Sequence, residues 1–167
     1  MKIVSDAGPI LSFARAGRLE LLRQVVIELL IPEAVLDDIT GRGRGKPGAF
    51  EVAQGTWIKS EKIRDRSLLE SISEKLDLGE REALALARET GAPLLVDERE
   101  ARKEALRLNI PYFGSLKILK EAKDHGIIAE AKPVLDAFIA SGTYLSDALR
   151  QDFLEELGES ESTPPKI

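Results

Sequence analysis

The stretch KIVSDAGPIL, residues 2–11, joins a short apolar run to a lone acidic residue and a Gly-Pro turn. The apolar run, MKIV at residues 1–4, predicts a buried strand, and Asp6 stands where that strand ends. Pro9 suits the first turn of a helix that follows at once. One carboxylate at the end of a strand means little by itself. The arrangement of the rest of the chain decides whether other acids reach the same place.

The composition bounds the class of protein. The chain has 167 residues, enough for one domain with a full hydrophobic core. It contains no cysteine, which excludes disulfides, thiol nucleophiles and zinc-cysteine sites and is compatible with a reducing cytoplasm. No apolar stretch approaches the roughly 20 residues of a membrane span, and the N-terminus lacks the pattern of a secretory signal. We therefore expect a cytoplasmic protein without membrane contact.

The balance of charged residues limits the classes of binding partner that we expect. The chain has 29 acidic and 24 basic residues, for a net charge of −5. This net charge disfavours a stoichiometric DNA-binding protein but does not exclude an enzyme that binds RNA through a local basic patch. The single histidine, His125, lies in KDHGII and is expected in a solvated turn. No other feature of the sequence supports a Ser-His-Asp catalytic site that would use this histidine.

Apolar runs that predict strands alternate with segments of helical spacing. Strands are expected at residues 1–4, 27–31, 56–63, 92–97 and 110–115. Helices are expected at residues 9–25, 32–40, 49–54, 78–91, 98–109, 115–126, 131–142 and 144–158, and residues 65–76 are amphipathic. This alternation favours an α/β fold, a three-layer α/β/α sandwich around a mostly parallel sheet. We expect a single domain over residues 1–158 and a disordered polar tail over residues 159–167.

Acidic residues recur where the predicted strands end. Asp6 follows the first strand, and Asp97 ends the strand at residues 92–97 with Glu98 beside it. In open parallel sheets, active sites gather beyond the carboxyl ends of the strands. These acids can therefore lie side by side, although they are far apart in the sequence.

The helix at residues 32–40 offers a further carboxylate. Asp37 and Asp38 are adjacent in it, and helical periodicity helps to choose between them. Asp38 lies one turn from Val35 and next to Ile39, so it can border the buried face.

The helix at residues 78–91 offers another candidate carboxylate. Glu80 shares a face with Leu84 and Ala87 and occupies the first turn, where the helix dipole tolerates its charge. Glu82 is expected closer to the outward side. Gly91 is a suitable residue to end this helix.

Four or five carboxylates in one cleft cannot all stay ionised unless a cation neutralises them. Mg²⁺ or Mn²⁺ fits, because hard cations take oxygen ligands, and such ions can activate water against a phosphodiester. The alternative is that these acids are helix caps and turn formers. Spacing alone leaves both interpretations open.

Four segments of the sequence resemble a known family in their order along the chain. They are IVSDAGPILSFARAGRLELL, LLIPEAVLDDI, DLGEREALALARETGAPLLVDEREARKEALRLNI and YFGSLKILKEAKDHGII. Together they are similar to PIN-domain proteins, and the nearest subgroup looks like the VapC-like toxins. The resemblance extends to about Gly158.

The resemblance implies a metal-dependent ribonuclease and assigns its site. The catalytic, metal-holding positions of the family match Asp6, Asp38, Glu80 and Asp97, with Glu98 alongside Asp97 as a further metal ligand. Which of Asp97 and Glu98 is the main ligand stays open. The implied cofactor is Mg²⁺ or Mn²⁺, and the implied substrate is RNA.

The sequence departs from the common family pattern at two supporting positions. Many members carry a Ser or Thr soon after the first Asp, where this chain has Ala7 and Gly8. Many also have a Thr before the last acids, where this chain has Val96. Ser5 is the candidate to replace such a hydroxyl in part.

Two groups of basic residues are candidates for contact with RNA. The loop GRGRGKPG, residues 41–48, carries Arg42, Arg44 and Lys46. It directly follows the helix of Asp38, so it is a candidate phosphate clamp, although a solvated turn is the alternative. A second basic group consists of Arg99, Arg102 and Lys103. It can equally be an exposed helix face.

Several functions remain in competition. The first is an endoribonuclease acting as the toxin of a type II toxin–antitoxin pair, and the resemblance implies a homodimer and a small antitoxin that covers the cleft. The second is an inactive PIN-fold module that binds a partner or RNA. The third, a phosphatase with Asp6 as nucleophile, is disfavoured because such enzymes usually need a second Asp at position 8, which is Gly.

Overall fold

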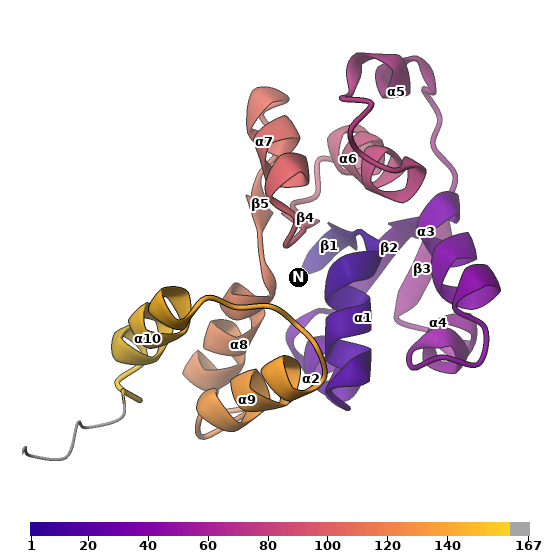
Figure 1. Ribbon diagram of the computed structural model, residues 1–167. Helices are drawn as coiled ribbons and strands as arrows, with labels where there is room; N and C mark the ends of the chain where they lie inside the picture. The colour runs from indigo at the N-terminus through magenta and orange to yellow at the C-terminus, as the bar shows by residue number, and fades with distance from the viewer. Residues whose placement is uncertain (161–167) are drawn as a thin grey trace, which may run out of the picture.

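A five-stranded parallel sheet forms the centre of the computed structural model, which describes residues 1–160 (Figure 1). Its strands are β1 (Lys2–Ser5), β2 (Glu28–Pro32), β3 (Ile58–Glu61), β4 (Leu94–Leu95) and β5 (Tyr112–Phe113). Their order across the sheet is β3-β2-β1-β4-β5, and every neighbouring pair is parallel. The predicted α/β/α sandwich is confirmed.

Helices cover both faces of this sheet. They are α1 (Ala7–Arg15), α2 (Leu19–Val25), α3 (Glu33–Asp37), the π-helical turn η1 (Asp38–Arg42), α4 (Ala49–Gln54), α5 (Ser67–Ser71), α6 (Leu78–Thr90), α7 (Arg99–Arg107), α8 (Ser115–Asp124), α9 (Lys132–Ala140) and α10 (Asp147–Glu156). In Figure 1, α5, α6 and α7 lie above the sheet, and α8 and α9 lie below it. Within residues 1–160, no helix has the length and apolar character needed to span a bilayer.

Successive strand residues feed two separate hydrophobic cores. Ile3 and Leu29 pack in a cluster with residues of α1, α2, α8 and α9. Val4 and Leu30 point to the other face and pack with residues of α6 and α7. All four side chains are fully buried. Burial on both faces explains why these strands are continuous apolar runs in the sequence.

The strand order places a crevice between β1 and β4. From β1 the chain proceeds to β2 and β3 on one side, whereas β4 and β5 lie on the other, so the order reverses at this point. Ser5 pairs with Leu95, which brings the carboxyl ends of the two strands together. Ligands of open α/β sheets bind at such a switch point. Asp6 and Asp97 follow these two ends, as the sequence predicted.

The helix expected at residues 9–25 is divided into α1 and α2. Gly17 has a φ of 68°, and the N–H of Arg18 donates to the carbonyl of Phe13 at 2.8 Å. This is a glycine-based helix end, in which a left-handed residue closes the last turn. The break lets α2 pack against α8.

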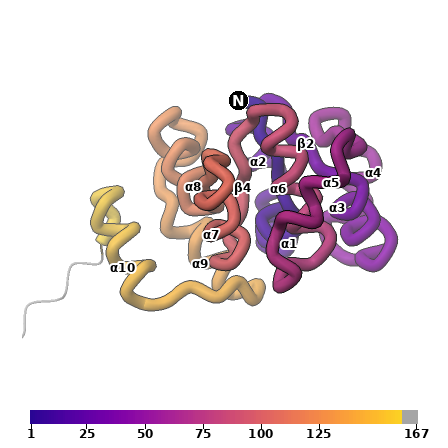
Figure 2. Tube along the Cα trace, turned by 90° about the horizontal axis from the view of Figure 1, so that it is seen from above, coloured from indigo at the N-terminus to yellow at the C-terminus, as the bar shows by residue number. Residues whose placement is uncertain are grey.

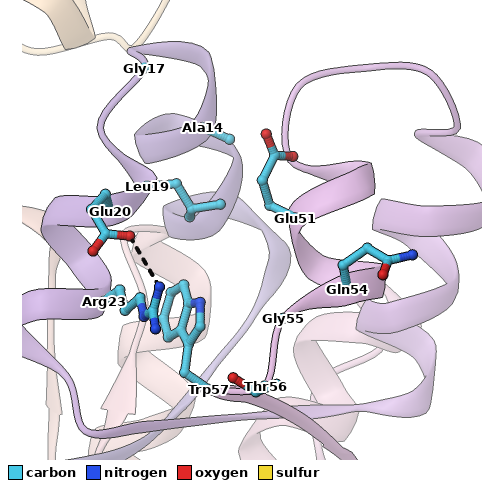
Figure 3. Close-up of a pocket in the computed structure, with 10 residues that line it drawn as sticks. All are labelled: Ala14, Gly17, Leu19, Glu20, Arg23, Glu51, Gln54, Gly55, Thr56 and Trp57. Carbon is cyan, nitrogen blue, oxygen red and sulfur yellow. Dashed lines mark ion pairs between the residues drawn. The ribbon is translucent and has the colours of Figure 1, made fainter.

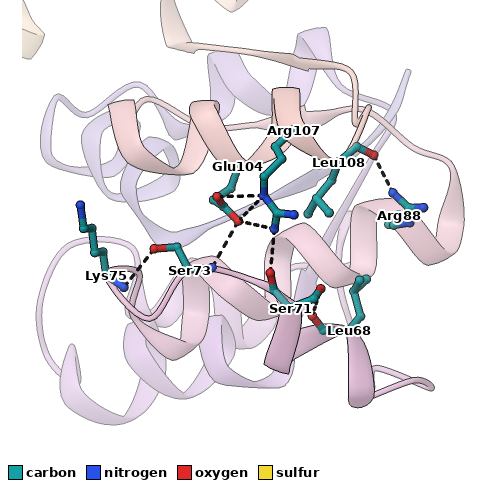
Figure 4. Close-up of polar contacts among 8 residues, drawn as sticks. All are labelled: Leu68, Ser71, Ser73, Lys75, Arg88, Glu104, Arg107 and Leu108. Carbon is teal, nitrogen blue, oxygen red and sulfur yellow. Dashed lines mark hydrogen bonds and ion pairs between the residues drawn. The ribbon is translucent and has the colours of Figure 1, made fainter.

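The amphipathic segment at residues 65–76 forms only the five-residue helix α5, and α7 holds the residues between α5 and α6 in place (Figure 4). Arg107 Nη2 donates to the carbonyl of Ser71 at 2.7 Å. The N–H of Ser73 donates to Glu104 Oε2 at 3.2 Å. These bonds satisfy the last carbonyl of α5 and a backbone N–H that follows the helix, and they anchor the segment that leads into α6.

The C-terminal helix α10 lies at one end of the molecule, beyond α8 and α9 (Figure 2). Glu159, the first residue of the predicted disordered tail, accepts from the N–H groups of Ala131 and Lys132 at 3.0 and 2.9 Å. Lys123 Nζ also donates to it at 2.8 Å. The part of the predicted tail from residue 161 onward lies outside the described residues.

Candidate metal centre

Asp6 is a buried acidic residue at the end of β1. Its side chain is 4% exposed, and its Oδ1 atom has no hydrogen-bond partner among the described residues. A Cβ atom added at Gly8, in the first turn of α1, would lie 3.6 Å from this Oδ1 atom, so the start of α1 lies beside the carboxylate. A buried oxygen without a partner is rare in folded proteins and calls for an explanation by function or by a missing ion.

Other carboxylates surround Asp6 and oppose its ionisation. Burial is the largest cause, and the charges of Glu80, Asp97 and Asp77 add to it, so that the pKa of Asp6 rises from 3.8 to about 8. The pKa of Glu80 is also raised, first by burial and then by the charges of Asp77 and Glu98. The structure therefore brings the predicted acids of β1, α6 and the end of β4 into one electrostatic group.

Asp77 is a member of this group that the sequence interpretation missed. It is the N-cap residue of α6, where its Oδ1 accepts from the N–H of Glu80 at 2.8 Å. In return, Glu80 Oε2 accepts from the N–H of Asp77 at 3.0 Å. The pattern D-x-x-E before an apolar helix is the signal of this reciprocal cap and identifies both residues from the sequence.

Asp38 borders the group from the side of α3. A Cβ atom at Gly79 would lie 3.0 Å from Asp38 Oδ2 and 3.4 Å from Asp77 Oδ1, so glycine leaves the space that these carboxylates occupy. Arg42 Nη1 lies 3.8 Å from Asp38 Oδ1 on the adjacent turn. Asp37 is exposed, which agrees with the choice of Asp38.

Asp97 is held in one orientation by the start of α8. The N–H of Ser115 donates to its Oδ1 at 2.8 Å, and the Ser115 hydroxyl donates to its Oδ2 at 2.6 Å. Arg102 Nη2 lies 3.7 Å from Oδ1. A Cβ atom at Gly114 would lie only 2.7 Å from the same oxygen and 2.0 Å from Arg102 Nη2, so a side chain at this position would displace the Asp97 carboxylate and the Arg102 guanidinium. The sequence interpretation missed Ser115 as a partner of Asp97.

Glu98 differs from Asp97 in its surroundings. It is exposed at the N-cap position of α7, and its side chain makes no capping hydrogen bond there. Its charge nevertheless acts on Glu80. Asp97 is thus a fixed carboxylate, whereas Glu98 is free to turn toward the same group.

Two expectations about neighbouring side chains are wrong. Glu82 does not face outward: it is 4% exposed, its Oε1 accepts from the N–H of Ala34 at 3.3 Å, and Arg66 lies 3.7 Å away. The start of α3 covers this face of α6 and supplies the partners. Ser5 donates its hydroxyl to the backbone carbonyl of Asp6 at 2.9 Å, so the hydroxyl supports the backbone rather than a carboxylate.

The donor set suits a divalent cation, although the side chains do not converge on one point. In the part of the chain that the structure describes, no three acidic or histidine side chains stand close enough to hold an ion. Asp97 and Glu80 are turned toward their own N–H partners. The unpartnered oxygen of Asp6 and the mutual repulsion of the acids are what a cation relieves, and carboxylate oxygens are ligands of Mg²⁺ and Mn²⁺. The residues therefore fit such an ion in their chemistry, and their side chains have to rotate to converge on it.

Other candidate features lie apart from this group. A pocket of about 460 Å³ is formed by residues of α1, α2 and α4 and the approach to β3 (Figure 3). Its charged residues include Glu20 and Arg23, which pair at 3.5 Å. His125 ends α8 with its side chain 68% exposed, as expected for a solvated turn.

Fold and site together define a parallel α/β protein with an acidic centre at the switch point of its sheet. A family model described as a PIN domain matches residues 2–159, and the chain belongs to the PIN-domain family. The resemblance found in the sequence is thereby confirmed at the level of the family. No curated protein matches the chain significantly.

Replacing Asp6 by Asn is expected to stabilise the metal-free protein at pH 8. Because folding raises the pKa of Asp6 to about 8, the folded chain keeps a proton that the unfolded chain releases, and stability falls as pH rises from about 4 to 8. The Asp6→Asn variant has no titratable carboxyl at this position, so its stability does not fall in this way as the pH rises. We expect a gain above about 1.4 kcal/mol at pH 8, the equivalent of one pKa unit, and a smaller one at pH 5. Urea unfolding in EDTA measures both.

Asp37→Asn is the matched control for this experiment, because Asp37 is exposed and outside the group. Its stability should follow that of the wild type at both pH values. An Asp6→Asn protein that is less stable than the wild type at pH 8 contradicts the account of a strained carboxylate.

Replacing Ser115 by Ala removes a hydrogen bond to a charged acceptor and is expected to lower the free energy of unfolding by about 1.5–3 kcal/mol. Ser115→Thr should restore most of it, because the hydroxyl is kept. Ser60→Ala, at an exposed position of β3, serves as the control and should change stability by less than about 0.5 kcal/mol. Equal losses in both alanine variants would show that the hydroxyl does not hold Asp97.

Proposed function

We propose that this protein is an endoribonuclease that depends on Mg²⁺ or Mn²⁺ and hydrolyses RNA phosphodiester bonds. One observation carries the proposal: the buried, unpartnered carboxylate of Asp6 faces the charges of Glu80 and Asp97 at the switch point of the sheet. Membership of the PIN-domain family supports a nuclease. The chemistry needs neither the absent cysteines nor the exposed histidine.

The proposed ligands are Asp6, Asp38, Glu80 and Asp97, acting directly or through water, with Glu98 as a further ligand beside Asp97. The bound ion would activate a water molecule and stabilise the charge that develops on the phosphate. Ser115 fixes the orientation of one ligand, Asp97, through its N–H and its hydroxyl. Asp77 keeps Glu80 at the start of α6.

The proton on Asp6 couples metal binding to pH. Its raised pKa means that Asp6 has to release a proton before it can hold an ion. Metal affinity should therefore increase as the pH rises toward 8, since ligands bind in the deprotonated form.

The biological role that we propose is that of the toxin in a type II toxin–antitoxin pair. This rests on the similarity of the sequence to VapC-like toxins. It implies a small antitoxin as a partner and a homodimer as the assembly.

An inactive PIN-fold module is the second candidate. It is favoured by Ala7 and Val96, which stand where many family members have hydroxyl groups, and by carboxylates that do not converge on one ion as they stand. Such a module would bind metal, RNA or a protein partner without turnover.

Cleavage of a labelled single-stranded RNA, with Mn²⁺, Mg²⁺ or EDTA, separates these functions. The wild type should cut the RNA only when metal is present. Asp6→Asn should lose more than the roughly 10–100-fold that is typical when a residue supporting a metal ligand is replaced. Circular dichroism checks that the variant is folded, and Asp37→Asn should cleave like the wild type.

Equal cleavage by the wild type and Asp6→Asn would exclude Asp6 from the reaction. A folded wild type that binds Mn²⁺ but cuts no RNA would instead favour the inactive module.

A further inference from the structure

The acidic group opens into a cleft of about 690 Å³. Asp6, Asp97 and Glu98 are among the residues that line it. Its walls come from α1, from the starts of α7 and α8, from α9 and from the segment that links α9 to α10. An inference about the occupant of this cleft rests on the proposed function, because it concerns the substrate of the same site.

Positive side chains line the cleft next to the acids. They are Arg15, Arg99, Arg102 and Lys117; Arg102 lies beside Asp97, and the other three are exposed. Arg15 lies nine residues after Asp6 and thus roughly 13 Å farther along α1, at 1.5 Å per residue. Within residues 1–160, neither Arg15 nor Arg99 forms an ion pair, and Lys117 Nζ lies 3.8 Å from Glu121 Oε1. These charges are available to phosphates.

The remaining surface of the cleft is largely apolar. Leu11, Leu116 and Ile139 contribute to it, and Tyr144 lines it with 89% of its surface exposed. Exposed aromatic and apolar groups next to cations suit unstacked bases, which stack on such side chains while the backbone follows the charges. A base-paired duplex does not offer its bases in this way.

We propose that this cleft is the binding groove for a single strand of RNA. Arg15, Arg99 and Lys117 hold its phosphates, Tyr144 stacks on a base, and the strand passes the carboxylates that line the cleft. The loop at residues 41–48, the other candidate for RNA contact, follows α3 near the β3 edge of the sheet, whereas the cleft lies toward α8 (Figure 1). The two basic surfaces can therefore be tested separately.

The test compares two variants that remove the same charge. One carries Arg15→Ala, Arg99→Ala and Lys117→Ala, and the control carries alanine at the three basic positions of the loop, Arg42, Arg44 and Lys46. Both also carry Asp6→Asn, as does the reference protein, so that bound RNA is not cut. Fluorescence anisotropy with a short labelled single-stranded RNA gives the dissociation constant over a series of salt concentrations.

We expect the cleft variant to bind at least about tenfold more weakly than the reference. The slope of log K against log salt should fall by about 2, because three lost phosphate contacts on a single strand contribute about 0.7 each. The loop variant should stay within about twofold. Unchanged binding by the cleft variant, or equal losses in both, would overturn the proposal and leave the cleft to a protein partner. If the triple variant fails to fold, Arg15→Ala and Lys117→Ala alone give the same comparison.

A second variant tests the contact with a base. Tyr144→Ala should weaken binding of the single strand several-fold, since each stacked base contributes to affinity. Phe50→Ala is the control, because Phe50 is an aromatic residue on α4 that is 73% exposed and lies outside the cleft. Equal affinity of the Tyr144 and Phe50 variants would contradict the assignment of Tyr144.

The proposed RNA-binding groove and the proposed nuclease activity can be disproved separately. If the cleft variant loses RNA binding and the wild type cuts no RNA, the result supports the RNA-binding groove and contradicts the proposed nuclease activity. The same three alanine substitutions can also be made in a chain that keeps Asp6. If that variant still cleaves RNA with metal, the result supports the nuclease and contradicts the RNA-binding groove.

Discussion

The buried carboxylate of Asp6 is the constraint on which the rest of the site depends. Burial of an ionised group without a partner is costly, and three neighbouring acids increase the cost. Either a proton or a cation has to neutralise this carboxylate. The fold enforces the arrangement, because the pairing of Ser5 with Leu95 sets the end of β1 beside the end of β4. The sheet therefore creates an electrostatic strain at the one place where the strand order reverses.

Small residues and short hydrogen bonds keep the other acids close to Asp6. Gly79 leaves room between α3 and α6, and Gly114 lets the start of α8 approach Asp97. The reciprocal cap of α6 holds Glu80 by a backbone group that belongs to Asp77. These contacts satisfy Asp77, Glu80 and Asp97 locally. They also mean that a metal has to compete with the protein partners of Glu80 and Asp97.

Local pattern was enough to predict the sheet and most of the acidic group. Continuous apolar runs identified parallel strands, and the rule that sites lie at carboxyl strand ends selected Asp6 and Asp97. Tertiary contacts decided what pattern could not. Glu82 lies on the polar side of its helix in sequence terms, yet the N–H of Ala34 and the charge of Arg66 allow its burial. The partnership of Ser115 with Asp97 joins residues 18 positions apart and arises only from the packing of α8 on the sheet.

The most direct test of a metal centre at Asp6 is a calorimetric titration with Mn²⁺ of the wild type, Asp6→Asn and Asp37→Asn at pH 8. The account predicts that the wild type and Asp37→Asn bind the ion and that Asp6→Asn binds it far more weakly or not at all. Equal binding by all three proteins would place the ion elsewhere. An absence of binding in the wild type would mean that these acids cap helices and form turns, and that the buried carboxylate of Asp6 is neutralised by its proton alone.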